Sequence, residues 1–152
     1  MPLFRVERRV RHKAVEMFDL VADVERYPEF VPLCKGLSVR SRRLEADGRE
    51  TVVANMTVGY KLIRETFTSR VTLDKPNLKV RVEYIDGPFS RLENVWTFAD
   101  DVEAGGSRVG FFIDYEFKSR TLGALMGSMF DAAFRKFSSA FEQRADVVYR
   151  RA

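Results

Sequence analysis

The chain has 152 residues, of which 45% are hydrophobic and 32% charged, and its formal net charge is +4. This composition excludes a disordered chain, and no apolar run approaches the roughly 18 residues of a membrane-spanning helix. Because Cys34 is the one cysteine, an intramolecular disulfide is excluded, and the thiol fits a reducing cytoplasm. We therefore expect one globular domain over residues 1–152 and a cytoplasmic location, with peripheral contact at the inner face of the cytoplasmic membrane left open.

The first part of the chain is predicted to form a strand and two short helices. Alternation of Phe4 and Val6 with polar residues predicts a strand over residues 3–10 rather than a signal or transit peptide. Helical spacing predicts a helix over residues 13–23, whose basic start and acidic end oppose the helix dipole. Either this helix end is simply solvated, or the basic cluster serves another purpose. Residues 27–34 contain two prolines, which prevent one continuous helix, and large apolar side chains that should cover one end of a core.

From residue 37 to residue 118, apolar and polar residues alternate in segments separated by turn signals such as those at 46–48, 75–77, 86–88 and 103–106. Six strands linked in this way predict an antiparallel meander with one buried face. We expect the residues that line this face to point toward the last helix. They are Met56, Val58, Phe67, Val82, Tyr84, Trp96, Phe98, Phe111, Ile113 and Tyr115.

Apolar residues recur at helical spacing over residues 121–149, which predicts a long amphipathic helix. The predicted architecture is α+β, with a curved antiparallel sheet wrapped around this C-terminal helix and a cavity between the two layers. Gly123 and Gly127 lie near Met126 and Met129 at the start of the helix. The two glycines indicate either close packing against a strand or a loose, methionine-lined gate over the cavity.

Residues that usually build catalytic or metal sites are scarce. His12 is the one histidine, so neither a His/Cys metal site nor a Ser-His-Asp or Cys-His arrangement is expected. No glycine-rich phosphate loop opens a helix. Strand carboxylates such as Asp114 and Glu116 are expected to form surface ion pairs. The sequence therefore predicts no catalytic residue, no metal and no cofactor that takes part in chemistry.

Two motifs carry a family resemblance. Residues 23–34, Asp-Val-Glu-Arg-Tyr-Pro-Glu-Phe-Val-Pro-Leu-Cys, resemble the signature of the coenzyme-Q-binding protein branch of the START-like superfamily, which is grouped with polyketide cyclases and lipid-transport proteins. Residues 87–89, Gly-Pro-Phe, followed by Leu92 and the Trp-Thr-Phe strand at 96–98, are similar to the same branch. The resemblance implies a helix-grip fold with a deep hydrophobic tunnel. In this family, mitochondrial members bind ubiquinone and support respiratory electron transfer, and a bacterial branch is described as ribosome-association toxins that bind the large subunit.

The resemblance leaves three functional hypotheses open. The first is non-enzymatic binding of a hydrophobic ligand, above all ubiquinone or a related isoprenoid or lipid; the second is a ribosome-associating regulator, and the third is a cyclase-type enzyme. Because residues 1–10 read as a strand and not as a presequence, we expect a bacterial or mature protein. No motif residue indicates the ligand's identity or the oligomeric state.

Two sets of side chains follow from these hypotheses. The expected ligand site contains Tyr27, Phe30, Val31, Pro32, Met56, Val58, Phe67, Trp96, Phe98, Phe111, Tyr115, Met126, Met129 and Phe130. The expected contacts to an anionic partner, either ribosomal RNA of the large subunit or an anionic membrane, are Arg5, Arg8, Arg9, Arg11, Lys13, Arg40, Arg42 and Arg43.

Overall fold

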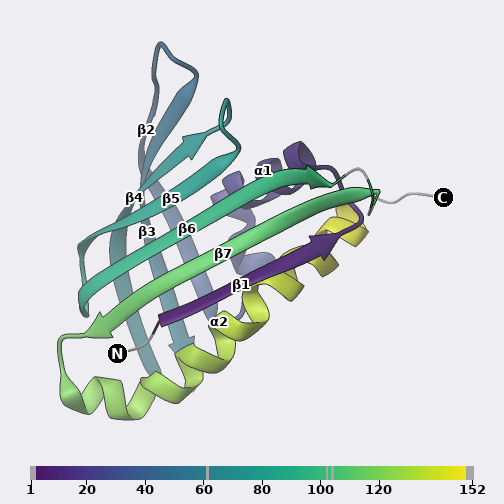
Figure 1. Cartoon of the computed structure of the whole chain (residues 1–152). Coiled ribbons are helices and arrows are strands. Elements are labelled where there is room, and N and C mark those ends of the chain that lie inside the picture. Colours follow the sequence, from purple (N-terminus) through teal and green to yellow (C-terminus); the bar gives the residue numbers. More distant parts are fainter. Residues whose placement is uncertain (1–2, 61, 102, 104, 150–152) are drawn as a thin grey trace.

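Seven strands and a long helix dominate the computed structural model, which describes residues 3–60, 62–101, 103 and 105–149 (Figure 1). A short α-helix and a 3-10 helix, η1, follow the first strand. In chain order the elements are β1 (Leu3–Val10), α1 (Ala14–Ala22), η1 (Val24–Glu29), β2 (Cys34–Leu44), β3 (Arg49–Tyr60), β4 (Ile63–Asp74), β5 (Lys79–Asp86), β6 (Phe89–Asp101), β7 (Gly106–Phe117) and α2 (Arg120–Val148).

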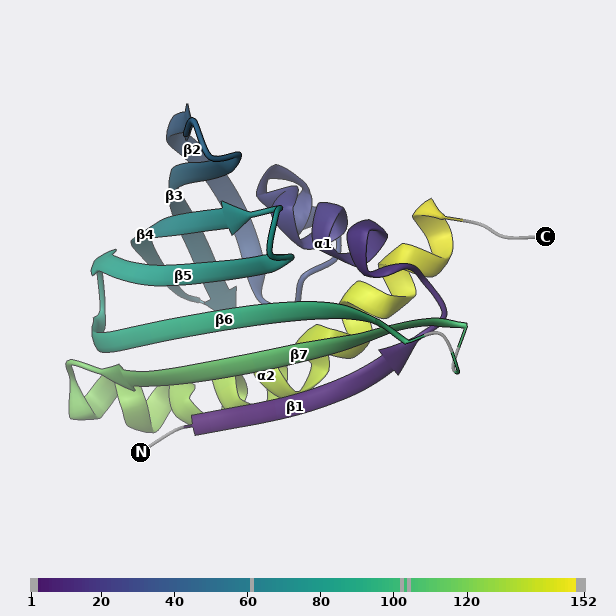
Figure 2. The ribbon, with the colours of Figure 1, turned by 45° about the horizontal axis from the view of Figure 1, so that its top comes forward.

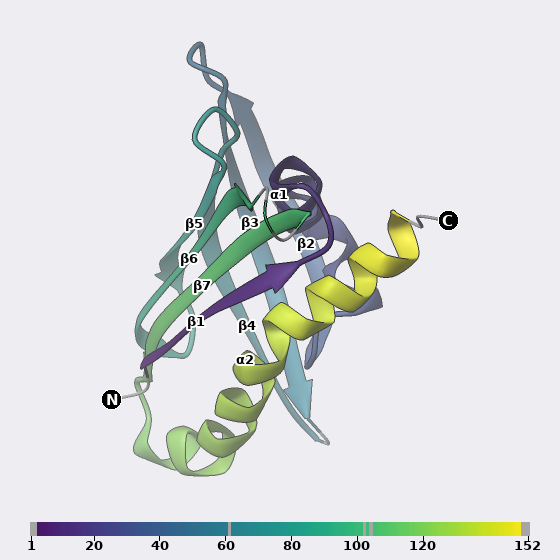
Figure 3. The same ribbon diagram turned by 45° about the vertical axis from the view of Figure 1, so that its right-hand side comes forward.

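The strands form one antiparallel sheet in the order β1-β7-β6-β5-β4-β3-β2. Strands β2 to β7 are a meander of consecutive neighbours, and β1 joins its far edge by pairing with β7, with Val6 opposite Phe111. The sheet is curved, and α2 runs across its concave side (Figures 1 and 3). The predicted α+β helix-grip architecture is therefore confirmed.

The predicted register of the sheet is confirmed as well. Phe111, Ile113 and Tyr115 are buried at 1–3% exposure, whereas Phe112 and Asp114 between them are partly exposed. Since side chains alternate between the faces of a strand, this pattern places the aromatic row of β7 on the inner face. The same alternation along β4 puts Phe67, Ser69 and Val71 inside.

Aromatic rings hold α2 against the sheet along most of its length. In its N-terminal half, Phe130 packs on Phe117 and Phe89, with ring centroids 5.2 and 6.0 Å apart. In its C-terminal half, Phe141 packs edge-to-face on Trp96 at 4.9 Å and on Tyr27 at 5.3 Å.

The ring contacts continue between these two residues of α2. Phe134 packs on Tyr115 at 5.0 Å, and Phe137 stacks on Phe111 at 5.9 Å. Each fully buried side chain of this size contributes about 1.5–3 kcal/mol, so the helix is fixed by a continuous row of rings.

The C-terminal end of α2 lies beside α1 (Figure 2), where polar contacts hold it. The buried His12 places its Nε2 atom 2.7 Å from a carboxylate oxygen of Asp146. Tyr149 donates a hydrogen bond of 3.0 Å to the main-chain carbonyl of Glu16. The one histidine of the chain thus holds a helix end in place.

Gly87 explains part of the Gly-Pro-Phe motif. It has φ of 144°, a conformation that side chains rarely adopt. A Cβ atom at this position would lie 2.5 Å from Cβ of Phe67. Phe67 in turn packs edge-to-face on Phe89, so the turn passes directly over an aromatic pair of the core.

We expect Gly87→Ala to lower the free energy of unfolding by about 2–4 kcal/mol, because backbone strain and the clash with Phe67 add. Urea denaturation measures the loss. Gly127→Ala is the matched control, since nothing lies within 4 Å of an added Cβ there, and helix propensity should raise stability by roughly 0.5–1 kcal/mol. Equal stability of Gly87→Ala and the original protein would contradict the close approach of Gly87 to Phe67.

Candidate functional site

A cavity lies between the concave face of the sheet, α2 and the segment that joins η1 to β2. Its empty space amounts to about 880 Å³ where the open mouth is included, but only about 90 Å³ is wide enough to centre a water molecule. The interior is therefore a narrow slot rather than a wide chamber. It is lined by Val24, Tyr27, Pro32, Leu33, Leu37, Ala54, Met56, Val58, Phe67, Ser69, Val71, Val82, Phe89, Leu92, Asn94, Trp96, Ile113, Phe130, Ala133, Phe134, Phe137 and Phe141.

Half of the residues that the sequence assigns to the ligand site line this cavity. These are Tyr27, Pro32, Met56, Val58, Phe67, Trp96 and Phe130. The other half lie elsewhere, although most of them are buried: Phe30, Val31, Phe98, Phe111, Tyr115, Met126 and Met129. The inner face of the sheet is thus larger than the cavity, and burial alone does not identify the residues that border it.

The displaced residues have other partners. Phe98 packs edge-to-face on Phe18 of α1, with centroids 5.9 Å apart. Phe111 stacks on Trp96 at 4.7 Å and on Phe137 of α2 at 5.9 Å. The wall that α2 contributes begins at Phe130, so the turns that contain Met126 and Met129 do not border the cavity where a gate was expected.

The lining residues that sequence reasoning missed fall into two groups. On α2 they are Ala133, Phe134, Phe137 and Phe141, whose helical spacing predicted an apolar face but not the wall of the cavity. On the sheet and in the η1–β2 segment, the missed residues are Val24, Leu33, Leu37, Ala54, Ser69, Val71, Val82, Phe89, Leu92, Asn94 and Ile113. One signal in the sequence could have located the cavity. Positions 54 and 133 are alanine within apolar patterns that otherwise carry larger side chains, and a small side chain leaves space beside its larger neighbours.

Few polar atoms face this cavity, and most of them are engaged within the protein. Trp96 donates to Oδ1 of Asn94 at 3.1 Å, and Nδ2 of Asn94 donates to the Phe112 carbonyl at 2.8 Å. The Tyr27 hydroxyl donates to the Val21 carbonyl, and burial raises the pKa of Tyr27. These contacts orient the polar groups toward the protein and leave the surface of the slot largely apolar.

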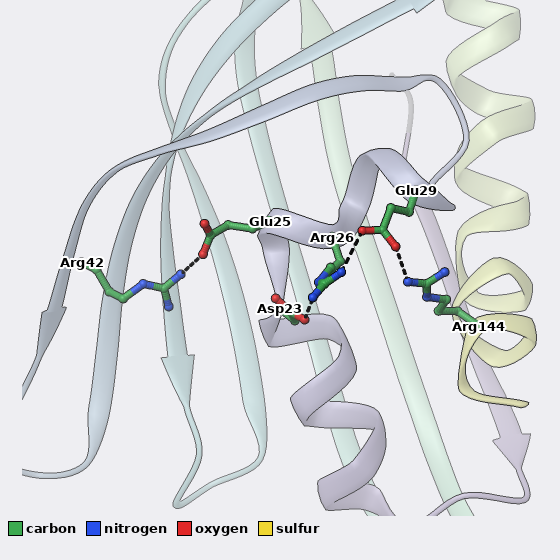
Figure 4. A network of polar contacts seen from close by, with 6 residues as sticks. All are labelled: Asp23, Glu25, Arg26, Glu29, Arg42 and Arg144. Atoms are coloured by element: carbon green, nitrogen blue, oxygen red, sulfur yellow. Dashed lines mark hydrogen bonds and ion pairs between the residues drawn. The ribbon is translucent and has the colours of Figure 1, made fainter. Parts of the chain in front are cut away.

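Ion pairs fasten η1 to both neighbouring layers (Figure 4). Glu25 pairs with Arg42 of β2 at 2.9 Å. Glu29 accepts hydrogen bonds from Arg144 of α2 and from Arg26, which lie 2.5 and 3.2 Å away. The hydrogen bond from Arg144, followed by that from Arg26, lowers the pKa of Glu29. The segment that borders the cavity is therefore held by exposed pairs, each of which is weak.

The basic residues expected to meet an anionic partner come from two edges of the sheet. β1 and β2 are the first and last strands in the order of the sheet. Arg5, Arg8 and Arg9 lie on β1, Arg11 and Lys13 follow it, and Arg40, Arg42 and Arg43 lie on β2. Their contact with an anionic partner remains a prediction.

Most of these basic side chains have acidic or aromatic partners. Arg8 pairs with Glu142, Arg9 with Asp101, Arg42 with Glu25 and Glu50, and Arg43 with Glu45, while Arg5 lies over the ring of Phe112. Within the described part of the chain, Arg11, Lys13 and Arg40 form no ion pair. The start of α1 is compensated by two carboxylates, because Lys13 N–H donates to Glu16 and Ala14 N–H donates to Asp100.

The carboxylates on the outer face of the sheet form the surface ion pairs that the sequence predicts. Asp114 and Glu116 both pair with Arg91, at 3.1 and 3.3 Å. Across residues 3–60, 62–101, 103 and 105–149, no three His, Cys, Asp or Glu side chains gather as metal ligands would. In that same part of the chain, no helix is long and apolar enough to cross a bilayer.

A curved sheet that grips a C-terminal helix around an apolar slot defines a START-like protein of the helix-grip class. The chain belongs to the polyketide cyclase / dehydrase and lipid transport family, whose model matches residues 10–142.

Three similar proteins place the chain within this family. The ribosome association toxin RatA of Rickettsia prowazekii is 30% identical over 150 residues, which cover 97% of this chain and 98% of that protein. The solution structure of an 18 kDa protein from Caulobacter crescentus is 35% identical, with a TM-score of 0.78 over 98% of this chain and 99% of that one. The mitochondrial coenzyme Q-binding protein COQ10 homolog B of Xenopus laevis is 31% identical over 139 residues, which cover 90% of this chain and 54% of that protein. The resemblance in residues 23–34 is thereby confirmed at the level of the family.

Cys34, the last residue of that signature, is buried at 6% exposure. Its sulfur lies 3.7 Å from the Gly36 carbonyl. Burial raises the pKa of the Cys34 thiol from 9.0 to about 11. A thiol in this setting stays protonated at neutral pH and is a poor nucleophile.

We expect Cys34 to react with a maleimide far more slowly in the folded protein than in urea at pH 8, since burial and the raised pKa both disfavour the thiolate. A folded-state pKa above the unfolded value also means that the contribution of Cys34 to stability is fully present below pH 9 and is lost as pH rises through about 11. Mass spectrometry after labelling measures the first effect and denaturation between pH 8 and pH 11 the second. Cys34→Ser should lack both effects, and labelling of the folded protein as fast as in urea would contradict the buried setting.

Proposed function

We propose that this protein binds a hydrophobic small molecule, with ubiquinone as the first candidate, in the slot between the sheet and α2. The binding is non-enzymatic and would support respiratory electron transfer by holding the quinone. The observation that carries this proposal is the slot itself, in which apolar and aromatic side chains from both layers meet over empty space. Ligand sites are usually concave, mostly apolar and provided with few polar groups.

The shape of the slot favours a flat ring or a flexible chain. Drug-sized ligands usually occupy roughly 300–1,000 Å³, so a ligand must move side chains apart where only about 90 Å³ is wide enough to centre a water molecule. Met56 borders the slot and is half-exposed, and methionine adapts readily to different shapes. An isoprenoid tail, which is narrow and apolar, fits these properties better than a bulky rigid ligand.

The composition of the slot supports binding rather than catalysis. Among the described residues, the side chains that line the slot include no carboxylate, imidazole or amine. General acid–base chemistry needs such a group within hydrogen-bonding distance of the reacting atom. A cyclase-type activity is therefore the weaker proposal, although the family description names it.

The name of the Xenopus laevis relative, a coenzyme Q-binding protein, supports ubiquinone as the ligand class. Trp96 offers a direct readout, because it is the one tryptophan of the chain and lines the slot. A bound quinone ring near Trp96 should quench its fluorescence.

We expect Ala133→Phe to lower the affinity for a short-chain ubiquinone at least about tenfold, because the new ring fills the slot. Ala133 is buried and lines the slot, whereas Ala124 on the same helix is exposed. Ala124→Phe is therefore the matched control and should bind like the original protein. Titration of Trp96 fluorescence measures both variants. Saturable quenching that is equal in Ala133→Phe and the original protein would place the ligand outside the slot and contradict the proposal.

Association with the large ribosomal subunit is the second candidate. The names of the relatives called ribosome association toxin support association with a ribosome. Arg11 and Lys13 are exposed cations between β1 and α1 that form no ion pair within the described residues. Contacts of cations with RNA phosphates release counterions, so such binding weakens as salt rises.

The slope of log affinity against log salt concentration tests whether the protein binds large subunits through these cations. If it does, Arg11→Gln combined with Lys13→Gln should reduce the magnitude of this slope by about 2. Arg81→Gln combined with Arg91→Gln removes the same charge from ion-paired positions and is the control. Sedimentation with purified large subunits and with cardiolipin vesicles separates the two anionic partners. An unchanged salt slope would remove Arg11 and Lys13 from the interface.

A further inference from the structure

One polar atom in the slot has no hydrogen-bond partner among the described residues. The side chains of Tyr27, Asn94 and Trp96 form the hydrogen bonds described above, but the hydroxyl of Ser69 is buried and forms none within the described part of the chain. Ser69 is 6% exposed. Buried polar side-chain atoms are nearly always hydrogen-bonded in native proteins, so each exception calls for an explanation.

The position of Ser69 directs its side chain into the slot. It lies on β4 between Phe67 and Val71, two positions away on either side, and both of these residues also line the slot. Its neighbour on β3 is Ala54, which lines the slot as well. Its neighbour on β5 is Tyr84, whose hydroxyl accepts a hydrogen bond of 3.1 Å from the Phe89 N–H. The Ser69 hydroxyl therefore lies on the inner face of the sheet among the lining residues of the slot.

Burial makes a hydroxyl without a partner unfavourable. A buried donor without a partner loses the free energy of its hydration and gains no hydrogen bond in exchange. A buried water usually needs two to four polar partners, and the Ser69 hydroxyl lies among a lining that is largely apolar. An oxygen of an apolar ligand would satisfy this hydroxyl without needing further polar partners.

We propose that the Ser69 hydroxyl is the polar recognition point of the slot and donates a hydrogen bond to an oxygen of the ligand. A ligand that can accept this hydrogen bond and also fit an apolar slot is an apolar molecule that carries a carbonyl oxygen, as a quinone ring does. An isoprenoid hydrocarbon without oxygen leaves the hydroxyl unpaired and gains nothing from it. This inference rests on the proposed function and specifies which part of the ligand meets β4.

The test compares Ser69→Ala with Ser107→Ala. Ser107 on β7 is a matched control. It is 0% exposed, and its hydroxyl also has no hydrogen-bond partner among the described residues. Unlike Ser69, it is not among the residues that line the slot. Each variant is titrated with a short-chain ubiquinone and with squalene, an isoprenoid hydrocarbon, by displacement of an apolar fluorescent dye from the whole chain. Urea denaturation confirms that both variants fold.

We expect Ser69→Ala to weaken ubiquinone binding about tenfold and to leave squalene binding unchanged, while Ser107→Ala alters neither. Infrared spectra of bound ubiquinone give a second readout. The carbonyl stretch should shift to lower wavenumber in the original protein and in Ser107→Ala, and should lose this shift in Ser69→Ala.

The outcomes separate the two levels of the proposal. Equal loss of ubiquinone and squalene binding in Ser69→Ala, or an unshifted carbonyl band in the original protein, overturns the role of Ser69 and leaves hydrophobic-ligand binding intact. Failure of the original protein to bind either molecule overturns the proposed function, and the role of Ser69 falls with it.

Discussion

The packing of α2 on the concave face of the sheet through a continuous row of aromatic rings is the constraint on which the rest of the structure depends. Phe130 and Phe141 both border the slot and are about 16 Å apart along the helix axis. Between them Phe134 packs on Tyr115 and Phe137 packs on Phe111, while Ala133 presents only a methyl group to the slot. The empty space thus lies beside a firmly packed helix rather than in a poorly filled core.

The sheet and the η1 border of the slot are held by different kinds of contact. The antiparallel ladders hold the inner face of the sheet. The η1 border is held by the ring contacts of Tyr27 and Phe30 with Phe141 and, in addition, by exposed ion pairs. Exposed ion pairs contribute little to stability, so the buried ring contacts hold this border more firmly than its ion pairs do.

The sequence was sufficient to predict the fold because its information is local. Alternation along β7 correctly placed Phe111 and Tyr115 inside, and helical spacing predicted α2 to within one residue at each end. The outline of the slot was not predictable in this way, because it depends on where the helix departs from the curved sheet. Phe134 and Phe111 have equally apolar surroundings in the sequence, yet only the first borders the slot. The distribution of the basic residues over two edges was not predictable for a related reason: nothing local shows that β1 pairs with β7 and that its arginines therefore lie at the edge opposite β2.

The pairing of the first strand with the last one has a consequence for synthesis of the chain. β1 leaves the ribosome first, but Val6 has no partner until Phe111 has been made more than a hundred residues later. At roughly 5–20 residues per second, β1 waits for about 5–20 s as an unpaired strand. Exposed strands of this kind are prone to associate with other chains, and charged side chains oppose that association. Arg5, Arg8 and Arg9 lie among the apolar residues of β1, so arginines that contact Phe112, Glu142 and Asp101 in the folded protein also oppose association of the nascent chain during that interval.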